Sequence, residues 1–233
     1  MNSPAPALLL RFFVGVLLLA VGPQLAFDAL RFVGFGADAA GSPAHVEHSL
    51  TAALLASVAV VGFARWQPPA WPWRPLQLLA VLRSWAWFLP LWVLLLLGYL
   101  ASASALGAPV AAQLPLRYLA DGDPARPGFW LVTAAIVVGA PCAEEIVFRG
   151  YLQGALQGVL RPPLAITIAA LLFGLVHSLP YALPVGVLGA MFGWLAARHG
   201  GLWPAVAAHA LHNGLTVLVT FCWPATLDFL YPR

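Results

Sequence analysis

Residues 128–158 read GFWLVTAAIVVGAPCAEEIVFRGYLQGALQG. A helix rises about 1.5 Å per residue and the hydrocarbon core of a bilayer is about 30 Å thick, so roughly 20 mostly apolar residues are enough to cross it. This stretch is long enough to span a membrane, yet Glu144, Glu145 and Arg149 fall inside it. It predicts a transmembrane helix that holds ionisable groups within the bilayer.

The composition of the whole chain also indicates a membrane protein. Of its 233 residues, 62% are hydrophobic and 8% are charged, whereas about 25% are charged in ordinary soluble domains. This excludes a conventional soluble protein, and the singly scattered arginines exclude a nucleic-acid-binding surface. We expect an all-α fold, a polytopic transmembrane helical bundle of about seven spans. Besides 128–158, the predicted spans are Ala7–Leu30, Ser49–Ala64, Trp85–Leu106, Pro163–Ser178, Ala182–Arg198 and Pro204–Trp223.

The first predicted span has a second interpretation. Arg11 followed by the apolar residues 12–21 is also typical of a signal peptide. No small-residue cleavage site follows, and apolar residues continue to Leu30, so we expect an uncleaved helix.

The arginines near the loop ends predict the orientation of the bundle. Six of them would lie on one side of the membrane, namely Arg11, Arg65, Arg74, Arg83, Arg161 and Arg198, and four on the other, namely Arg31, Arg117, Arg126 and Arg233. Because loops rich in arginine stay in the cytoplasm, this distribution favours a cytoplasmic N-terminus. All acids other than Glu144 and Glu145 fall on the second side.

The charges inside the 128–158 span form the first polar cluster. Glu145 and Arg149 are four residues apart and share a helix face, so they can form an ion pair that lowers the cost of burying both. Glu144 is turned by about 100° from Glu145 and is left without a partner at that spacing. The alternative is that a shorter helix ends before the cluster, which would then be solvated. Apolar residues continue beyond Gly150, so we expect the helix to run through, with a bend near Pro141.

Two further clusters place histidines inside predicted spans. His177 lies near the end of the fifth span, and His209 and Asn213 share a face of the seventh. Ionisable groups in a membrane span are functional candidates by default. The alternatives are an interfacial histidine and a pair of side chains that hydrogen bond two helices together. His212 follows His209 by three residues, and we leave it outside the site.

The spacing along the chain brings two of these clusters to the same depth. If the fourth and fifth spans form a hairpin that turns near Arg161, Glu144 lies 17 residues before the turn and His177 lies 16 after it. At about 1.5 Å per residue, both lie roughly 24 to 26 Å from the turn. His209 and Asn213 are closer in sequence to their own turn near Gly201, so only helix tilt would bring them to this depth.

The three clusters together resemble a known family. The motifs are Glu-Glu-x-x-x-Arg at Glu144, Glu145 and Arg149, Phe-x-x-x-His at Phe173 and His177, and His-x-x-x-Asn at His209 and Asn213. In this order on three helices they resemble the CPBP family of CAAX proteases and bacteriocin-processing enzymes, which is related to the type II CAAX prenyl protease (Ras-converting enzyme) and includes myxosortase-like members. The resemblance covers roughly Gly128–Trp223, and the first half of the chain matches only in spanning the membrane.

The resemblance implies an intramembrane glutamic-type endopeptidase that needs no cofactor. Glu144 would be the general base that activates water, His177 would help to position that water, and His209 with Asn213 would stabilise the oxyanion. Glu145 and Arg149 would hold the helix in register. The chain would divide into N-terminal transmembrane helices (1–127), a catalytic helical core (128–223) and a short tail (224–233). Its partners would be the bilayer and a membrane-associated protein or peptide. The chain contains no lysine, which is typical of a GC-rich genome, so we expect its location to be a bacterial inner membrane.

Two other functions remain open from the sequence. One Glu and two His also make a catalytic zinc set, which would use Glu144, His177 and His209 as ligands, although His-Glu-x-x-His is missing. The other is a non-proteolytic membrane protein, such as a bacteriocin-immunity factor or a scaffold. The substrate also stays open among prenylated CAAX tails, leader peptides and C-terminal sorting tails.

Overall fold

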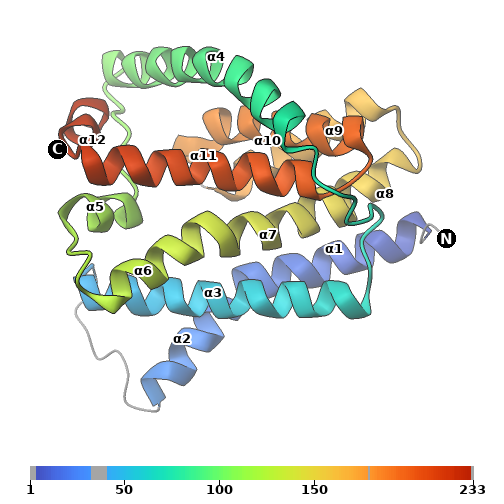
Figure 1. Ribbon diagram of the computed structural model, residues 1–233, viewed down its shortest axis with the longest axis horizontal. Helices are drawn as coiled ribbons and strands as arrows, with labels where there is room; N and C mark the ends of the chain where they lie inside the picture. The colour runs from blue at the N-terminus through green and yellow to red at the C-terminus, as the bar shows by residue number, and fades with distance from the viewer. Residues whose placement is uncertain (1–3, 33–40, 178, 232–233) are drawn as a thin grey trace.

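The computed structural model describes residues 4–32, 41–177 and 179–231, which form a bundle of helices (Figure 1). No strand occurs among these residues. The α-helices are α1 (Ala5–Ala20), α2 (Gly22–Phe32), α3 (Pro43–Trp66), α4 (Leu78–Ala105), α5 (Leu114–Asp121), α6 (Pro127–Ala134), α7 (Ala140–Glu145), α8 (Gly154–Gln157), α9 (Pro162–Val176), α10 (Ala182–His199), α11 (Trp203–Cys222) and α12 (Ala225–Leu230). Two π-helical segments, η1 (Ala135–Gly139) and η2 (Ile146–Gln153), and a 3₁₀ turn, η3 (Leu179–Tyr181), complete the set.

The predicted all-α transmembrane bundle is confirmed. Six helical stretches in the described residues are long and apolar enough to cross a membrane, and α9 is a shorter apolar helix beside them. The first of the six, Ala5–Phe32, joins α1 and α2, and another, Pro127–Gln157, runs from α6 to α8. Each of the seven predicted spans therefore corresponds to an apolar helix.

The helix that carries the Glu144–Glu145 pair is continuous, so the alternative of a loop end at this cluster is wrong. It passes from α6 through η1 into α7, and from there through η2 into α8. Pro141 lies in the first turn of α7, directly after η1. Since proline has no N–H to donate, the wide π-turn accommodates it at the point where we expected a bend. The two acids thus lie on one short α-helical turn between two π-helical segments.

A stripe of fully buried polar side chains fixes this helix against α10. Glu145, Arg149 and Gln153 follow one another at intervals of four residues, and all three are 0% exposed. Arg149 Nη2 donates to the Gly189 carbonyl at 2.8 Å, and Gln153 Nε2 donates to the Gly193 carbonyl at 3.0 Å. Both acceptors lie on α10, so this stripe sets the register between the two helices.

Glycines allow α9 to lie close to α10. A Cβ atom added at Gly174 would lie less than 3.0 Å from the carbonyl oxygen of Ala182 at the start of α10, a separation that real side chains do not tolerate. The close approach brings the C-terminal end of α9, and with it His177, to the middle of the bundle.

Candidate active site

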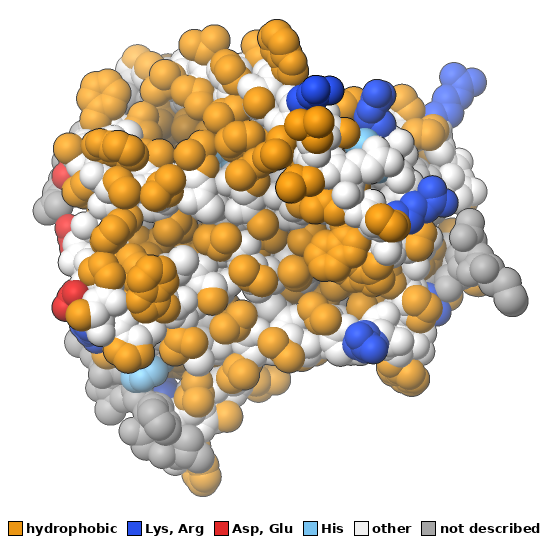
Figure 2. Space-filling model, viewed as in Figure 1, with side chains coloured by type: hydrophobic (Ala, Val, Ile, Leu, Met, Phe, Trp, Pro, Cys, Tyr) orange, Lys and Arg blue, Asp and Glu red, His pale blue; other side chains and the backbone are white. Residues whose placement is uncertain are grey.

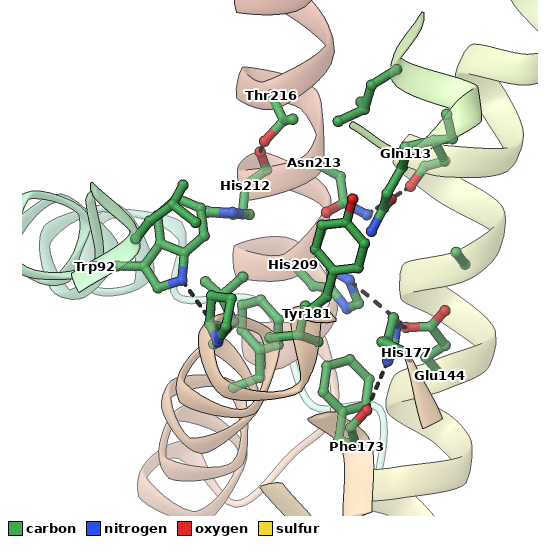
Figure 3. Close-up of a pocket in the computed structure, with 18 of the residues that line it drawn as sticks. Trp92, Gln113, Glu144, Phe173, His177, Tyr181, His209, His212, Asn213 and Thr216 are labelled. Carbon is green, nitrogen blue, oxygen red and sulfur yellow. Dashed lines mark hydrogen bonds and ion pairs between the residues drawn. The ribbon is translucent and has the colours of Figure 1, made fainter. Parts of the chain in front are cut away.

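The predicted site residues from three helices meet around the Glu144 carboxylate (Figure 3). Glu144 Oε2 lies 3.5 Å from His177 Nε2 and 3.9 Å from His209 Nε2. The side chains of Glu144, His177 and His209 are 19%, 27% and 7% exposed, so all three are largely withdrawn from the surface. The depth match that the sequence predicted for Glu144 and His177 is confirmed, and helix packing brings His209 to the same point.

The helix that carries His177 also orients its ring. His177 is the C-cap of α9, and its Nδ1 lies 2.7 Å from the Phe173 carbonyl oxygen. A carbonyl can only accept, so we assign the hydrogen of this bond to Nδ1. The Phe173 ring packs against the imidazole with 4.5 Å between centroids. As a result Nε2 is the nitrogen that faces Glu144.

The Glu145 carboxylate holds His209 from the opposite side. Oε1 of Glu145 accepts from His209 Nδ1 at 2.8 Å and from Arg149 Nη1 at 2.9 Å. The Phe192 ring stacks on the imidazole at 4.6 Å with 16° between the planes. The predicted ion pair between Glu145 and Arg149 is therefore present, and the same carboxylate directs Nε2 of His209 toward Glu144. The spacing within one helix showed no sign of this second contact.

Asn213 lies one turn beyond His209 on α11, on the wall of the same cavity. Its Nδ2 donates to the Ile136 carbonyl at 2.9 Å, within η1. The wide π-helical turn thus supplies an acceptor that fixes the amide. One of the two N–H groups of Asn213 is used by this bond, and the other stays available to a ligand.

A cavity of about 260 Å³ joins these residues. Its walls contain five of the seven predicted residues, whereas Glu145 and Arg149 lie behind the wall and support it. Polar and aromatic residues that the sequence analysis did not select also line it, including Trp92, Gln113, Tyr181, His212, Thr216 and Tyr231.

His212, which we left outside the predicted site, forms part of the cavity wall. Its side chain is 5% exposed, and its ring meets the edge of Trp92 at 4.4 Å. Trp92 in turn donates from Nε1 to the Pro184 carbonyl at 3.0 Å. The spacing of three residues between His209 and His212 was the one sequence signal that His212 lies near the site. Its contact with the cavity wall depends on the position of α4, which carries Trp92.

A second cavity reaches the same carboxylate from the other side of α7. It measures about 320 Å³ and is lined by Val16, Leu19, Ala20, Pro23, Ala53, Ser57, Ala140, Glu144, Phe148, Val176 and His177. Ser57 is its one polar residue apart from Glu144 and His177, and the Ser57 hydroxyl donates within α3 to the Ala53 carbonyl. Glu144 and His177 therefore stand between a partly polar cavity and a largely apolar one.

Comparison with known proteins finds a family match over the segment that carries the site. Residues 126–215 match the Rce1-like family, described as Type II CAAX prenyl endopeptidase Rce1-like. This confirms the resemblance to the CAAX protease family, and the matched residues include Glu144, His177, His209 and Asn213. No curated protein matches the chain, and no solved structure does.

The apolar helices give the kind of protein, and the Rce1-like match over residues 126–215 indicates a kind of activity. The chain is an integral, multi-pass membrane protein, and the match supports a protease of the CAAX type that acts on a membrane-associated substrate. Among the described residues, no group of three or more His, Cys, Asp or Glu side chains is arranged to hold a metal ion.

Proposed function

We propose that this protein is an intramembrane endopeptidase in which Glu144 activates water to cleave a peptide bond near the terminus of a membrane-associated protein. The observation that carries the proposal is the position of the Glu144 carboxylate. It faces the Nε2 atoms of two histidines at 3.5 and 3.9 Å, at the junction of two cavities. A buried carboxylate with an access route on each side is suited to act as a general base on a bound peptide.

In the proposed reaction, Glu144 accepts a proton from a water molecule positioned by His177. The water oxygen attacks the peptide carbonyl carbon, and the C–O double bond opens to a tetrahedral oxyanion. His209 and the free N–H of Asn213 stabilise this negative charge. The C–N bond then breaks, and the proton held by Glu144 goes to the departing amine. No other reactant is needed, since water supplies both the oxygen and the proton.

Glu145 acts as a positioning residue in this scheme. The bond between its Oε1 and His209 Nδ1 fixes the imidazole so that Nε2 faces the cavity, where it can be directed at the oxyanion. The ion pair with Arg149 holds the Glu145 carboxylate in place behind the cavity wall.

The two cavities suit a substrate that is partly embedded in the bilayer. The apolar cavity adjoins Val176, which is 59% exposed on the flank of α9, and so it is reached from the side of the bundle. The partly polar cavity contains Gln113 and Thr216, which can bind a peptide main chain. We therefore assign the membrane-embedded part of the substrate to the apolar cavity and its polar end to the other.

The direct test is the variant Glu144→Gln, assayed for cleavage in purified form. The amide keeps the shape of the side chain but cannot accept the proton, so cleavage is expected to vanish while the melting temperature stays within about 2 °C of wild type. The matched control is Asp28→Asn on α2. This substitution also removes the charge of an acid, but at an exposed position outside the site, so the variant should cleave normally. Cleavage by Glu144→Gln at the wild-type rate would refute the base. A wild-type protein that cleaves no membrane-anchored peptide would favour the non-proteolytic alternative.

A further inference from the structure

The charges of the bundle are segregated between its two ends. Arginines gather at one end, as Figure 2 shows for the visible face. They are Arg11, Arg65, Arg74, Arg83, Arg161 and Arg198. Four of them lie at helix ends or in loops there, Arg83 lies in the second turn of α4, and Arg11 of α1 donates to the Pro68 carbonyl in the loop between α3 and α4 at 2.7 Å. Among the described residues, the acids outside the site occur in the segments that meet at the other end, namely α2, α3, α5, the loop 122–126 and α12.

The opposite end is acidic. Within the described residues its net charge is −2, from three arginines and five acids, whereas the arginine end carries +6. The residues of the acidic end are Arg31, Arg117, Arg126, Asp28, Glu47, Asp121, Asp123 and Asp228. Two of its three arginines are paired with acids. Arg117 bonds Asp228, and Arg126 Nη2 lies 2.8 Å from Glu47 Oε1.

A hydroxyl completes this acidic end. Tyr118 donates to Glu47 Oε1 at 2.7 Å. Burial, and then the bond to this carboxylate, raise the pKa of Tyr118 to about 12, so the hydroxyl remains a donor at physiological pH. The short helix α5 is thereby tied to the start of α3.

The segregation determines which end faces the cytoplasm. Short loops rich in arginine are retained on the cytoplasmic side, whereas acids contribute little to orientation. Six arginines against three in the described residues place the arginine end in the cytoplasm. The acidic end, with α5 and α12, then faces the opposite side of the membrane.

The partly polar cavity leads toward the acidic end. Between Glu144 and that end it is bounded by Leu116 of α5, by Tyr231 after α12, and by Gln113 and Tyr181, both of which are labelled in Figure 3. Leu116 lies in α5, and Gln113 and Tyr231 adjoin α5 and α12, the two helices that the Arg117–Asp228 contact joins.

The route from Glu144 to the arginine end is closed by packed side chains and by the loop between α3 and α4. Glu145, Arg149 and Gln153 are 0% exposed, and so is Tyr151 beside them. The loop seals this end with backbone bonds, from Ala70 N to the Gly150 carbonyl at 2.9 Å and from Leu202 N to the Pro72 carbonyl at 3.2 Å. The Tyr151 hydroxyl adds a bond to the Gln67 carbonyl at 2.7 Å.

We propose that the catalytic cavity opens to the extracytoplasmic face, so that the substrate is the terminus of an exported polypeptide anchored in the membrane. This rests on the proposed function, and it narrows the substrate class. A prenylated tail is presented on the cytoplasmic face, where the bundle is sealed, whereas the sorting tail or leader of an exported protein reaches the open face.

Cysteine labelling in intact cells tests the orientation without any assay of cleavage. In a Cys142→Ser/Cys222→Ser background, Asp123→Cys reports the acidic end and Val159→Cys, in the exposed turn between α8 and α9, reports the arginine end. A membrane-impermeant maleimide should label Asp123→Cys on intact cells and Val159→Cys only after permeabilisation. The reverse pattern overturns the proposal.

Gln113→Cys in the same background tests the cavity itself. The impermeant maleimide should label it on intact cells, as it labels Asp123→Cys. Labelling of Gln113→Cys only after permeabilisation would overturn the outward opening.

The substrate class is tested in cells by comparing the protein termini of membranes from wild type and Glu144→Gln. Changed termini on exported membrane proteins support the inference, and changed termini confined to cytoplasmic prenylated proteins overturn it. If no terminus changes, the proposed function fails, while the labelling still decides the orientation.

Discussion

Arg149→Met tests how the buried charges hold the site together. The guanidinium donates to Glu145 Oε1 at 2.9 Å and to the Gly189 carbonyl at 2.8 Å, and it lies 4.3 Å from the centre of the Phe173 ring. Both charged side chains are 0% exposed. Removing one partner of a buried ion pair costs about 3 to 5 kcal/mol, chiefly because the other charge is left buried without compensation. At about 2 to 4 °C per kcal/mol for a chain of this size, the melting temperature should fall by roughly 6 to 20 °C.

A second variant separates the charge effect from the lost volume. In Glu145→Gln/Arg149→Met both charges are gone, and the glutamine oxygen can still accept from His209 Nδ1. Replacing both members of a buried pair is much less harmful than removing one, so about 2 kcal/mol of the loss should return.

Thermal unfolding of the purified variants in one detergent measures both effects. Arg161→Met, an exposed arginine in the turn before α9, is the matched control and should unfold within about 0.5 kcal/mol of wild type. If Arg149→Met is as stable as this control, the ion pair does not stabilise the bundle and the reasoning fails. If the double variant is less stable than Arg149→Met, charge compensation is not the cause of the loss.

The remaining predictions concern the oxyanion donors, the metal and the packing of α10. His209→Ala and Asn213→Ala should each lower the turnover number by about 10² to 10³, the usual loss for one oxyanion donor, and a turnover within twofold of wild type would remove that residue from the mechanism. Elemental analysis of active, chelator-washed protein should find no stoichiometric zinc, and one tightly bound zinc per chain that tracks activity would establish the metal alternative. Gly189→Ala should destabilise the protein by about 1 to 3 kcal/mol in thermal unfolding, because the added Cβ would lie 2.9 Å from Phe173 Cδ1 and 3.0 Å from Arg149 Nη2. An unchanged melting temperature would contradict this close packing.

Much of the fold could be predicted from the sequence because the controlling rules are local. A run of about 20 apolar residues must become a helix in a bilayer, where each backbone polar group needs a partner within its own segment. The Glu145–Arg149 ion pair could also be predicted locally, since a separation of four residues places both side chains on one helix face. Nearly equal distances in sequence from the Arg161 turn predicted that Glu144 and His177 lie at one depth. The 3.5 Å between Glu144 Oε2 and His177 Nε2 agrees with this prediction.

Only the tertiary structure decided how the helices turn toward one another. The bond from His209 to Glu145 joins residues 64 positions apart, and no periodicity within either helix encodes it. The place of His212 in the cavity wall likewise depends on α4, which supplies Trp92 from far along the chain. No pattern in the sequence predicted the π-helical segments η1 and η2 on either side of α7.

The same division applies to access to the site. The sequence alone predicted six arginines at one end of the bundle and the acids outside the site at the other, because the order of the spans decides to which end each loop belongs. It did not determine which end of the bundle is open. That depends on the 67–75 loop sealing one end through backbone bonds to Gly150 and Leu202, while α5 and α12 leave a cavity at the other. Such contacts arise from the three-dimensional meeting of distant segments, which a linear pattern of apolar and polar residues does not specify.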